Sequence, residues 1–514
     1  MSTTSDIGAV ASSAAAATEI GCAVLEAGGN AADAAVATAV ALTVADPANA
    51  SLLGRCHAVV VDGDSAQAID GATRAPDVLG PARGRCEGHA AAPLPGLLPA
   101  LERLHRGHGR MPWADLIAPS AALARAGFVV GPNLALAWAG AAADLARDAG
   151  ARRHWLAADG SAPAAGSRHR LPALADLLDA IARGGAAALH ADAGPALVAD
   201  NRAGGGFWTE AELAGCQALD GEVVRIGYRD HELVTVGRQA WGHTLALMLA
   251  LLERAPAGDG RGQSLDPMRV AIAMHEALAA QPQEIGTLSP RPAALDHDAL
   301  LTPATVGALE ARVARLLASA PREVTQRVAT AMRWPTGPVR DTTNLAAVDG
   351  DAMAVALTQS MGPHFGARVA SREHGGLFAH SYRMANEPAP GARDRTEMTP
   401  AVLLRGGLPR LAVGGAGSER IPGATAQVIA RLVDLGEGIV SAVSRSRPNW
   451  SHGALVVQDA SLRERLAARG LPVAPSGHTG IVHAVSRRDD GVLEAAADPA
   501  WDGRGQVARR EPAA

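Results

Sequence analysis

Residues 341–360 read DTTNLAAVDGDAMAVALTQS, and the architecture of the chain can be worked out from them. Val, Leu, Ala and Thr are frequent on both sides of Gly350-Asp351, and glycine adopts the backbone angles that a tight turn needs. Two apolar runs joined in this way are typical of a β-hairpin. The sequence therefore predicts two adjacent buried strands, with Thr342 near the start of the first.

The segment before this hairpin, residues 334–338 (WPTGP), is typical of a loop and makes the Asp341–Thr342 peptide bond a candidate cleavage site. Cleavage would give Thr342 an α-amine with a pKa near ~7.7–8.0 beside its own hydroxyl. The residue would then carry a nucleophile and its base together. The alternative is that Thr342 and Thr343 are ordinary strand residues, and strand propensity by itself favours that alternative.

The motifs along the chain resemble those of the γ-glutamyltransferase family from about residue 7 to residue 505. In that family the nucleophile is the first residue of a Thr-Thr-His motif, followed by Ser-Val-Val-Asp, a turn, and an Ala-Val-x-x-Thr strand that leads to Phe-Gly. The residues at the same spacing here are Thr342-Thr343-Asn344, Ala347-Val348-Asp349, Ala354-Val355, Thr358 and Phe365-Gly366. The resemblance implies an α+β fold, a four-layer αββα sandwich of the N-terminal-nucleophile hydrolase type. Residues 1–341 and 342–514 would be the large and small segments of one such unit.

Near the N-terminus, the Ala-rich run from Ala9 to Ala27 predicts a helix that stops at Gly28-Gly29. A second helix is predicted to begin at Asn30 as its N-cap, with Asp33 in its first turn. The string Gly-Gly-Asn-Ala-x-Asp-Ala-Ala-Val resembles the N-terminal signature of the same family, and we expect it to belong to a helical layer rather than to the catalytic site.

The resemblance also implies the residues of the active site. Thr342 would be the nucleophile, hydroxyls of Thr358 and Ser360 on the partner strand would orient it, and the backbone N–H groups of Gly417 and Ser418 would form an oxyanion hole. The residues expected to contact substrate are Arg74, Asn344, Arg383, Thr396 and Glu397.

The substrate site departs from the family pattern in several places. Asn344 stands where the family has His, Gly362 replaces an Asn, and Arg74 comes two positions later than the carboxylate-binding Arg. Glu397 stands where a Ser would bind the substrate α-carboxylate, and two carboxylates side by side repel each other. The sequence therefore predicts weak turnover of γ-glutamyl substrates.

The composition excludes several classes of function. All 47 basic residues are Arg, so a lysine Schiff base with pyridoxal phosphate and a P-loop lysine are both excluded. The net charge of −5, without an Arg-rich run containing aromatic residues, indicates that nucleic acid is not a partner. No spacing of His, Cys and carboxylates indicates a metal site, and no cofactor is expected.

The compartment is predicted from cysteine usage and from the absence of targeting segments. Cys22, Cys56, Cys86 and Cys216 form no Cys-x-x-Cys pair and are expected to be reduced. The sequence shows no secretory signal and no apolar stretch of ~20 residues, so we expect a cytoplasmic protein without a membrane span.

The leading functional hypothesis is an autoprocessed N-terminal-threonine hydrolase or transferase, whose two fragments remain associated. It would cleave an amide or acyl bond of a small amino-acid-like molecule through an acyl-enzyme on Thr342. One alternative is a carbon–carbon bond hydrolase of an alkylproline-type pathway of antibiotic biosynthesis, which would use the same Thr. The other is an uncleaved, non-catalytic homologue with a binding or structural role.

Overall fold

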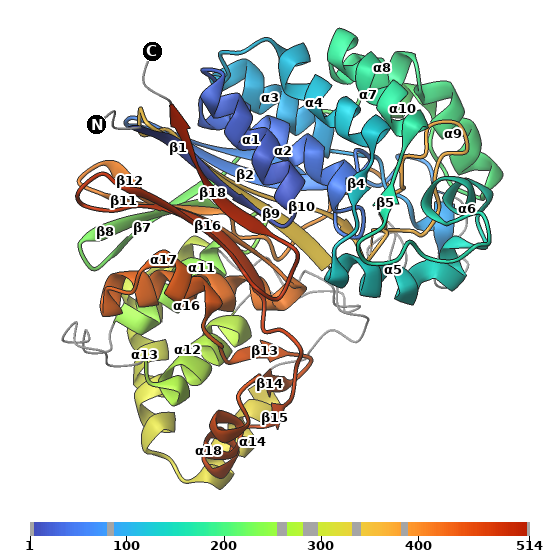
Figure 1. Ribbon diagram of the computed structural model, residues 1–514. Helices are drawn as coiled ribbons and strands as arrows, with labels where there is room; N and C mark the ends of the chain where they lie inside the picture. Colours follow the sequence, from blue (N-terminus) through green and yellow to red (C-terminus); the bar gives the residue numbers. More distant parts are fainter. Residues whose placement is uncertain are drawn as a thin grey trace.

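The computed structural model describes residues 5–79, 87–253, 265–280, 297–331, 341–381 and 389–510. Two stacked β-sheets lie at the centre of the molecule, and helices cover the outer face of each (Figure 1). This arrangement confirms the predicted αββα sandwich. None of the described helices is both long and apolar enough to cross a membrane.

The first sheet has seven strands in the order β18-β1-β9-β10-β2-β3-β6, and every neighbouring pair is antiparallel. Its strands are β1 (Ser5–Ser12), β2 (Arg55–Asp62), β3 (Ser65–Gly71), β6 (Leu219–Gly221), β9 (Asp341–Asp349), β10 (Ala354–Gly362) and β18 (Arg504–Arg510).

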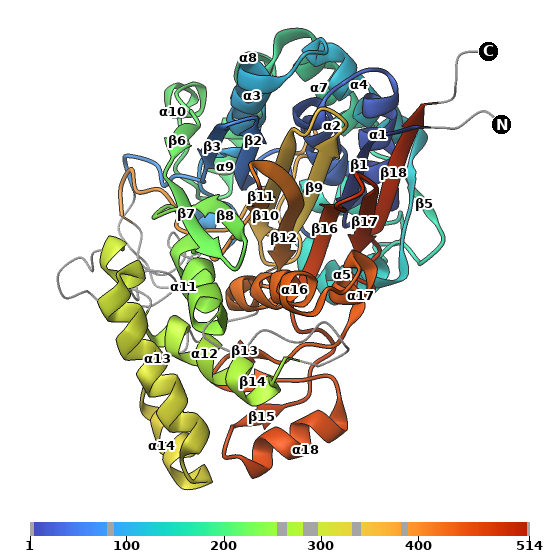
Figure 2. The same ribbon diagram turned by 90° about the vertical axis from the view of Figure 1, so that its left-hand side faces the viewer.

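The second sheet has six antiparallel strands in the order β17-β16-β12-β11-β8-β7 (Figure 2). They are β7 (Val223–Tyr228), β8 (His231–Val236), β11 (Ala401–Arg405), β12 (Leu408–Ala416), β16 (Ile481–Arg487) and β17 (Leu493–Ala497). Short strands form two further small sheets: β4 (Phe128–Val129) with β5 (Arg168–His169), and β13 (Asn449–Ser451) with β14 (Ala454–Val456) and β15 (Val473–Ala474).

The helices divide between the two outer layers (Figure 1). On the side of the first sheet are α1 (Ala15–Glu26), α2 (Ala31–Ala45), α3 (Leu97–His108), α4 (Trp113–Ala126), α5 (Pro132–Leu145), α6 (Ala149–Trp155), α7 (Pro172–Gly184), α8 (Ala186–Ala191), α9 (Gly194–Ala203) and α10 (Glu210–Ala214). On the side of the second sheet are α11 (Gly242–Glu253), α12 (Pro267–Ala280), α13 (Pro303–Ala318), α14 (Pro321–Ala331), α16 (Ile421–Leu435), α17 (Ile439–Ser444) and α18 (Ala460–Ala468).

The predicted hairpin is formed by β9 and β10, which pair from Val348 opposite Ala354 to Asn344 opposite Thr358. Successive side chains of a strand point to opposite faces. On β9, Leu345 and Ala347 pack against the helical layer, whereas Ala346 and Val348 pack between the two sheets. Thr342 and Asn344 therefore share the face that points toward the second sheet.

The N-terminal helix prediction was wrong at its start. The chain from Ser5 to Ser12 is strand β1, and helix α1 begins only at Ala15. The alanines of this run suit a helix by propensity, but β1 pairs with both β18 and β9, and this tertiary pairing overrides the local preference. The Asn30 cap is confirmed, because its side chain accepts from Asp33 N–H at 3.0 Å.

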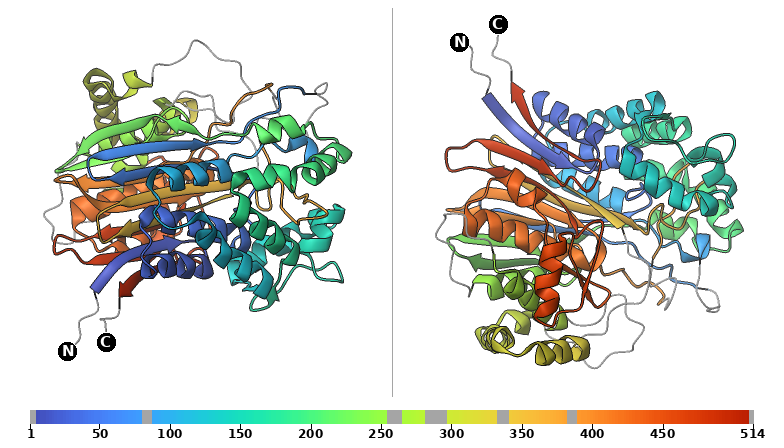
Figure 3. Two further views of the ribbon diagram at one scale, coloured as in Figure 1. Left: turned by 90° about the horizontal axis from the view of Figure 1, so that it is seen from above. Right: turned by 60° about the horizontal axis from the view of Figure 1, so that its bottom comes forward.

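Both sheets contain strands from each side of residue 341. In the first sheet β9 and β10 lie between β1 and β2, and β18 completes the edge beside β1. The first and last strands are thus neighbours, and the two chain ends leave the molecule side by side (Figure 3).

Candidate active site

Thr342 lies at the beginning of β9 and borders a cavity of about 290 Å³. Its side chain is almost fully buried, with 7% of the residue exposed. The cavity is enclosed by the loops after β1 and β17, helix α5, the turn after β12 and the beginning of β16. Its walls include Ser13, Asn49, Leu136, Gly417, His483 and Trp501.

The face of β9 that carries Thr342 is in close contact with the second sheet at Gly414 of β12. A Cβ atom added to Gly414 would lie 3.0 Å from Thr358 Oγ1 and 3.1 Å from Asn344 Cβ. Any larger residue would require these side chains to shift, so glycine favours this close approach of the two sheets. Between the same two sheets, Asn344 Nδ2 donates to the main-chain oxygen of His483 at 3.0 Å.

On the opposite face of β9, Thr343 begins a chain of short hydrogen bonds. Thr343 Oγ1 lies 2.5 Å from Ser13 Oγ, which donates to Asp46 at 2.5 Å, and Asn49 Nδ2 donates to the same carboxylate at 3.0 and 3.2 Å. Burial raises the pKa of Asp46 to about 6, although the hydrogen bonds from Ser13 and Asn49 oppose that rise. Ser13 and Asn49 also line the cavity, so this buried carboxylate is linked to the surroundings of Thr342.

The turn after β12 brings the expected oxyanion-hole residues to the other wall. Gly417 lines the cavity with a φ of 117°, and Ser418 follows with a φ of 56°, a value that residues other than glycine seldom adopt. Arg420 fixes the turn, because its Nε donates to the oxygen of Gly417 at 3.0 Å. Backbone N–H groups at such a turn can stabilise a developing oxyanion.

The two hydroxyls expected to orient the nucleophile are on the same face of the hairpin as Thr342. Thr358 Oγ1 is buried and makes no hydrogen bond within the described structure, so it does not bond Thr342. Ser360 Oγ accepts from Gly362 N–H at 3.0 Å, where the β9–β10 register shifts. The structure therefore does not reproduce the predicted contact between the Thr358 hydroxyl and Thr342.

The residues expected to contact substrate are not gathered around this cavity. Arg74 pairs with Asp77 at 2.5 Å, Thr396 is buried and accepts from Met398 N–H at 3.4 Å, and Glu397 is half-buried. None of these predicted residues is found among the described residues that line the cavity. Arg383 lies outside the described residues.

A buried arginine, Arg55, occupies the β2 side of the hairpin. Arg55 stands opposite Ser360 in the sheet and forms an ion pair with Asp394 at 3.5 Å. The hydroxyls of Thr73 and Ser381 each donate to the same carboxylate at 2.8 Å. The hairpin end therefore has a charged cluster on one side and the cavity on the other.

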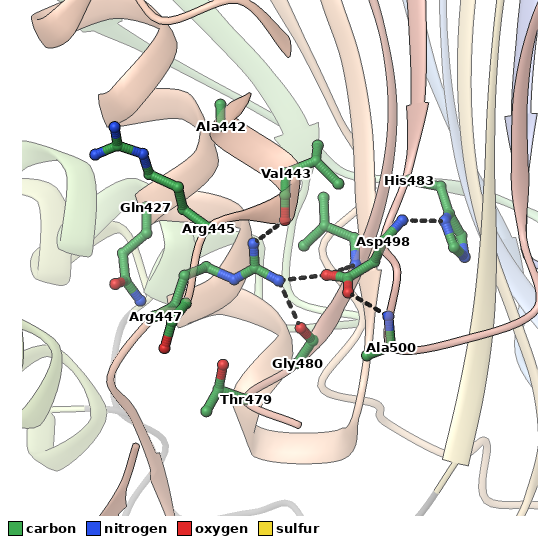
Figure 4. A network of polar contacts seen from close by, with 12 residues as sticks. Gln427, Ala442, Val443, Arg445, Arg447, Thr479, Gly480, His483, Asp498 and Ala500 are labelled. Carbon is green, nitrogen blue, oxygen red and sulfur yellow. Dashed lines mark hydrogen bonds and ion pairs between the residues drawn. The ribbon is translucent and has the colours of Figure 1, made fainter. Parts of the chain in front are cut away.

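Sequence reasoning did not identify His483, which comes from β16 and lines the cavity. Its ring is held by a buried network (Figure 4), in which Arg447 pairs with Asp498 and donates to the oxygens of Val443 at 2.5 Å and Gly480 at 2.9 Å. The N–H of Asp498 then donates to His483 Nδ1 at 3.3 Å. Burial lowers the pKa of His483 to about 4, so the imidazole is neutral near pH 7.

No cluster of three or more His, Cys, Asp or Glu side chains suited to a metal ion exists within the described ranges. Cys22, Cys56 and Cys216 are free thiols, and Cys86 lies outside those ranges. The chemistry available beside Thr342 is that of hydroxyl, amide, imidazole and backbone N–H groups, which suits nucleophilic attack with stabilisation of an oxyanion.

Comparisons with known proteins agree with this geometry. The chain is 30% identical to "Acylase ACY 1 proenzyme" of Pseudomonas sp. (strain V22), over 93% of this chain and 89% of the relative. It is 26% identical to "Glutathione hydrolase-like YwrD proenzyme" of Bacillus subtilis (strain 168), over 95% and 96%. The fold matches that of the cephalosporin acylase from Bacillus halodurans with a TM-score of 0.84 and 24% identity, covering 98% of this chain and 96% of the other.

The family model for gamma-glutamyltranspeptidase matches residues 17–508, nearly the whole chain. The full-length similarity to acylases and glutathione hydrolases and the shared sandwich fold agree with that match. This chain is therefore an enzyme of the N-terminal-nucleophile hydrolase type and belongs to the gamma-glutamyltranspeptidase family.

Proposed function

We propose that this enzyme cleaves its own Asp341–Thr342 bond and then uses Thr342 to hydrolyse an acyl amide of a small molecule. The observation that carries the proposal is that Thr342, at the start of a strand, borders a cavity whose other wall is the Gly417 turn. Nucleophile and oxyanion donors must meet at one reacting carbonyl, and these two elements lie around the same space.

The first reaction would be self-cleavage. Thr342 Oγ1 attacks the carbonyl carbon of Asp341, the peptide C–N bond breaks, and the nitrogen takes up a proton as an ester forms. Water then hydrolyses that ester, which returns the hydroxyl of Thr342 and leaves a carboxylate on Asp341. The new α-amine has an ordinary pKa near ~7.7–8.0 and can act as a general base near neutral pH.

The second reaction would use the same hydroxyl on an external amide. The α-amine of Thr342 removes the hydroxyl proton, Oγ1 bonds to the substrate carbonyl carbon, and the oxyanion is stabilised by N–H groups at Gly417 and Ser418. The leaving amine receives the proton, and water hydrolyses the acyl-enzyme. If an amine attacked the acyl-enzyme in place of water, the enzyme would act as a transferase.

The cavity favours an acyl amide over a γ-glutamyl amino acid. Its described lining contains no Arg, Asp or Glu, and the polar groups beside Thr342 are amides, hydroxyls and imidazoles. An α-amino acid headgroup carries both charges and needs charged partners when it is buried. Among the relatives, the name acylase therefore suits this site better than the name glutathione hydrolase.

The test is direct. Purified protein should separate into two fragments on a denaturing gel, and the smaller fragment should begin Thr-Thr-Asn. Thr342→Ala should remain one chain, whereas Thr325→Ala, a change at an exposed threonine of α14, should cleave normally. A full-length single chain that still turns over an acyl anilide would overturn the mechanism. Mass spectrometry of products would separate amide hydrolysis from cleavage of a carbon–carbon bond.

A further inference from the structure

Asn49, in the wall of the cavity beside Thr342, carries a hydrogen-bond acceptor that the protein leaves unused. Asn49 Nδ2 donates to both oxygens of Asp46, which fixes the orientation of the amide because a carboxylate accepts hydrogen bonds. Asn49 Oδ1 must therefore point away from Asp46. This oxygen is buried and has no hydrogen-bond partner within the described chain.

His483, in the same cavity wall, carries an unused hydrogen-bond donor. His483 Nδ1 accepts the N–H of Asp498 and so carries no proton, which places the single proton of the neutral imidazole on Nε2. His483 Nε2 is buried, and none of the described residues accepts a hydrogen bond from it. The Arg447–Asp498 ion pair and the bond from Ala500 N–H to Asp498 at 3.0 Å hold this arrangement rigid (Figure 4).

An apolar surface accompanies these two polar atoms. Leu136 of α5 borders the cavity and is one of the exposed large apolar side chains of the molecule. Trp501, after β17, borders it as well and stacks at an angle against His364, with ring centroids 5.7 Å apart. A ligand that enters here meets an apolar rim and a polar floor that contains Thr342.

The geometry points to recognition of an uncharged amide within the acyl group of the substrate, with its carbonyl accepting from His483 Nε2 and its N–H donating to Asn49 Oδ1. One donor and one acceptor, each buried and unpaired, complement the two polar groups of a secondary amide. An N-acylated amino-acyl group with an apolar terminus has this chemistry, and an unmodified amino acid does not. This inference rests on the proposed role of Thr342 as the nucleophile.

The experiment uses two esters that differ only in the amide. N-Acetylglycine p-nitrophenyl ester and p-nitrophenyl pentanoate have acyl chains of equal length, and each releases p-nitrophenol when Thr342 Oγ1 is acylated. After subtraction of the rate with Thr342→Ala, the self-cleaved wild type should show kcat/KM at least about 10-fold higher for the amide ester, the discrimination expected from hydrogen bonds to buried groups. Equal kcat/KM values for the two esters would overturn the inference.

Two variants at His483 assign the donor. His483→Gln keeps an N–H near the position of Nε2 and should retain most of the preference, whereas His483→Leu should bring the ratio of kcat/KM values for the two esters close to one. A His483→Leu enzyme with the full preference would exclude His483 as the donor. If His483→Leu does not self-cleave, the wild-type ratio decides the matter alone. Absence of Thr342-dependent release from either ester would instead refute the proposed function, so the two failures are distinguishable.

Discussion

Asn344 donates a hydrogen bond from Nδ2 to the main-chain oxygen of His483 at 3.0 Å, and this bond joins the two sheets beside the candidate nucleophile. Asn344 is completely buried. Its amide therefore supports the strand that carries His483. Asn344→Leu should lower the free energy of unfolding by ~1–3 kcal/mol, because the buried carbonyl of His483 would lose its partner.

Denaturant unfolding of the two proteins at one pH measures this loss. Leu408→Ala, at an exposed position of β12 in the same sheet, is a suitable control and should change stability by no more than ~0.5 kcal/mol. Equal stability of Asn344→Leu and wild type would show that the bond contributes nothing to the contact between the sheets.

A second prediction concerns the close approach of the sheets at Gly414. In Gly414→Ala the new methyl group would press on the side chains of Thr358 and Asn344, which would have to shift by a few tenths of an ångström. We expect the free energy of unfolding to fall by ~1–3 kcal/mol and self-cleavage to be slower. Gly140→Ala is the matched control, since nothing lies within 4 Å of its added Cβ on helix α5. That variant should be ~0.5–1 kcal/mol more stable than wild type. A stable, normally cleaving Gly414→Ala would contradict the packing argument.

Asp46 should make stability depend on pH. Its folded-state pKa of about 6 lies above the ordinary value of 3.8, so the folded protein binds a proton more tightly than the unfolded chain does. The cost of burying this carboxylate is thus absent below the unfolded-state pKa and is fully present above the folded-state pKa. Among the neighbouring residues, His364 lowers the pKa of Asp46 and Asp502 raises it.

Asp46→Asn removes this titration and keeps an acceptor for Ser13. Its unfolding free energy relative to wild type should rise by up to ~3 kcal/mol from pH 4 to pH 7, as a shift of about two pKa units implies. Denaturant midpoints at several pH values give the difference directly. A difference that stays constant with pH would show that the carboxylate ionises in the fold as it does in water.

The absence of lysine allows the α-amine of Thr342 to be titrated by chemical labelling. Because the chain has no Lys, the only amines for an amine-reactive acylating reagent are α-amines, including the one that self-cleavage would create on Thr342. The N-terminal peptide of the smaller fragment should therefore take up an amide-linked label, with a rate that rises around pH ~7.7–8.0. Thr342→Ala should give no such labelled peptide, and an unlabelled N-terminus of the wild-type small fragment would argue against a free amine.

Local patterns in the sequence were sufficient for some elements and not for others. The β9–β10 hairpin and the Asn30 cap were predictable, because a turn glycine between two apolar runs and a capping residue act over a few neighbouring positions. Strand β1 was not, because its alanines favour a helix by propensity and form a strand only between β9 and β18.

The candidate site shows the same limit. Thr342 was predicted from its position at the start of the hairpin together with the family resemblance. Ser13, Trp501 and His483 come from distant segments and meet only in the folded sheets. Arg74 is an apt carboxylate partner by residue type, and yet it pairs with Asp77 and is not found among the described residues of the cavity wall. Residue type predicts chemistry, whereas convergence of segments depends on tertiary structure.

The strand order has a consequence for how the mature enzyme can be made. β9 and β10 from one side of residue 341 are inserted between β1 and β2 from the other side, and β18 returns to pair with β1. An uncut chain forms this arrangement in a unimolecular reaction. If the proposed scission after Asp341 occurs, reassembly from denaturant would become bimolecular and would slow with dilution. An intact precursor would then act as its own template, and a nicked enzyme, once unfolded, would not be readily remade.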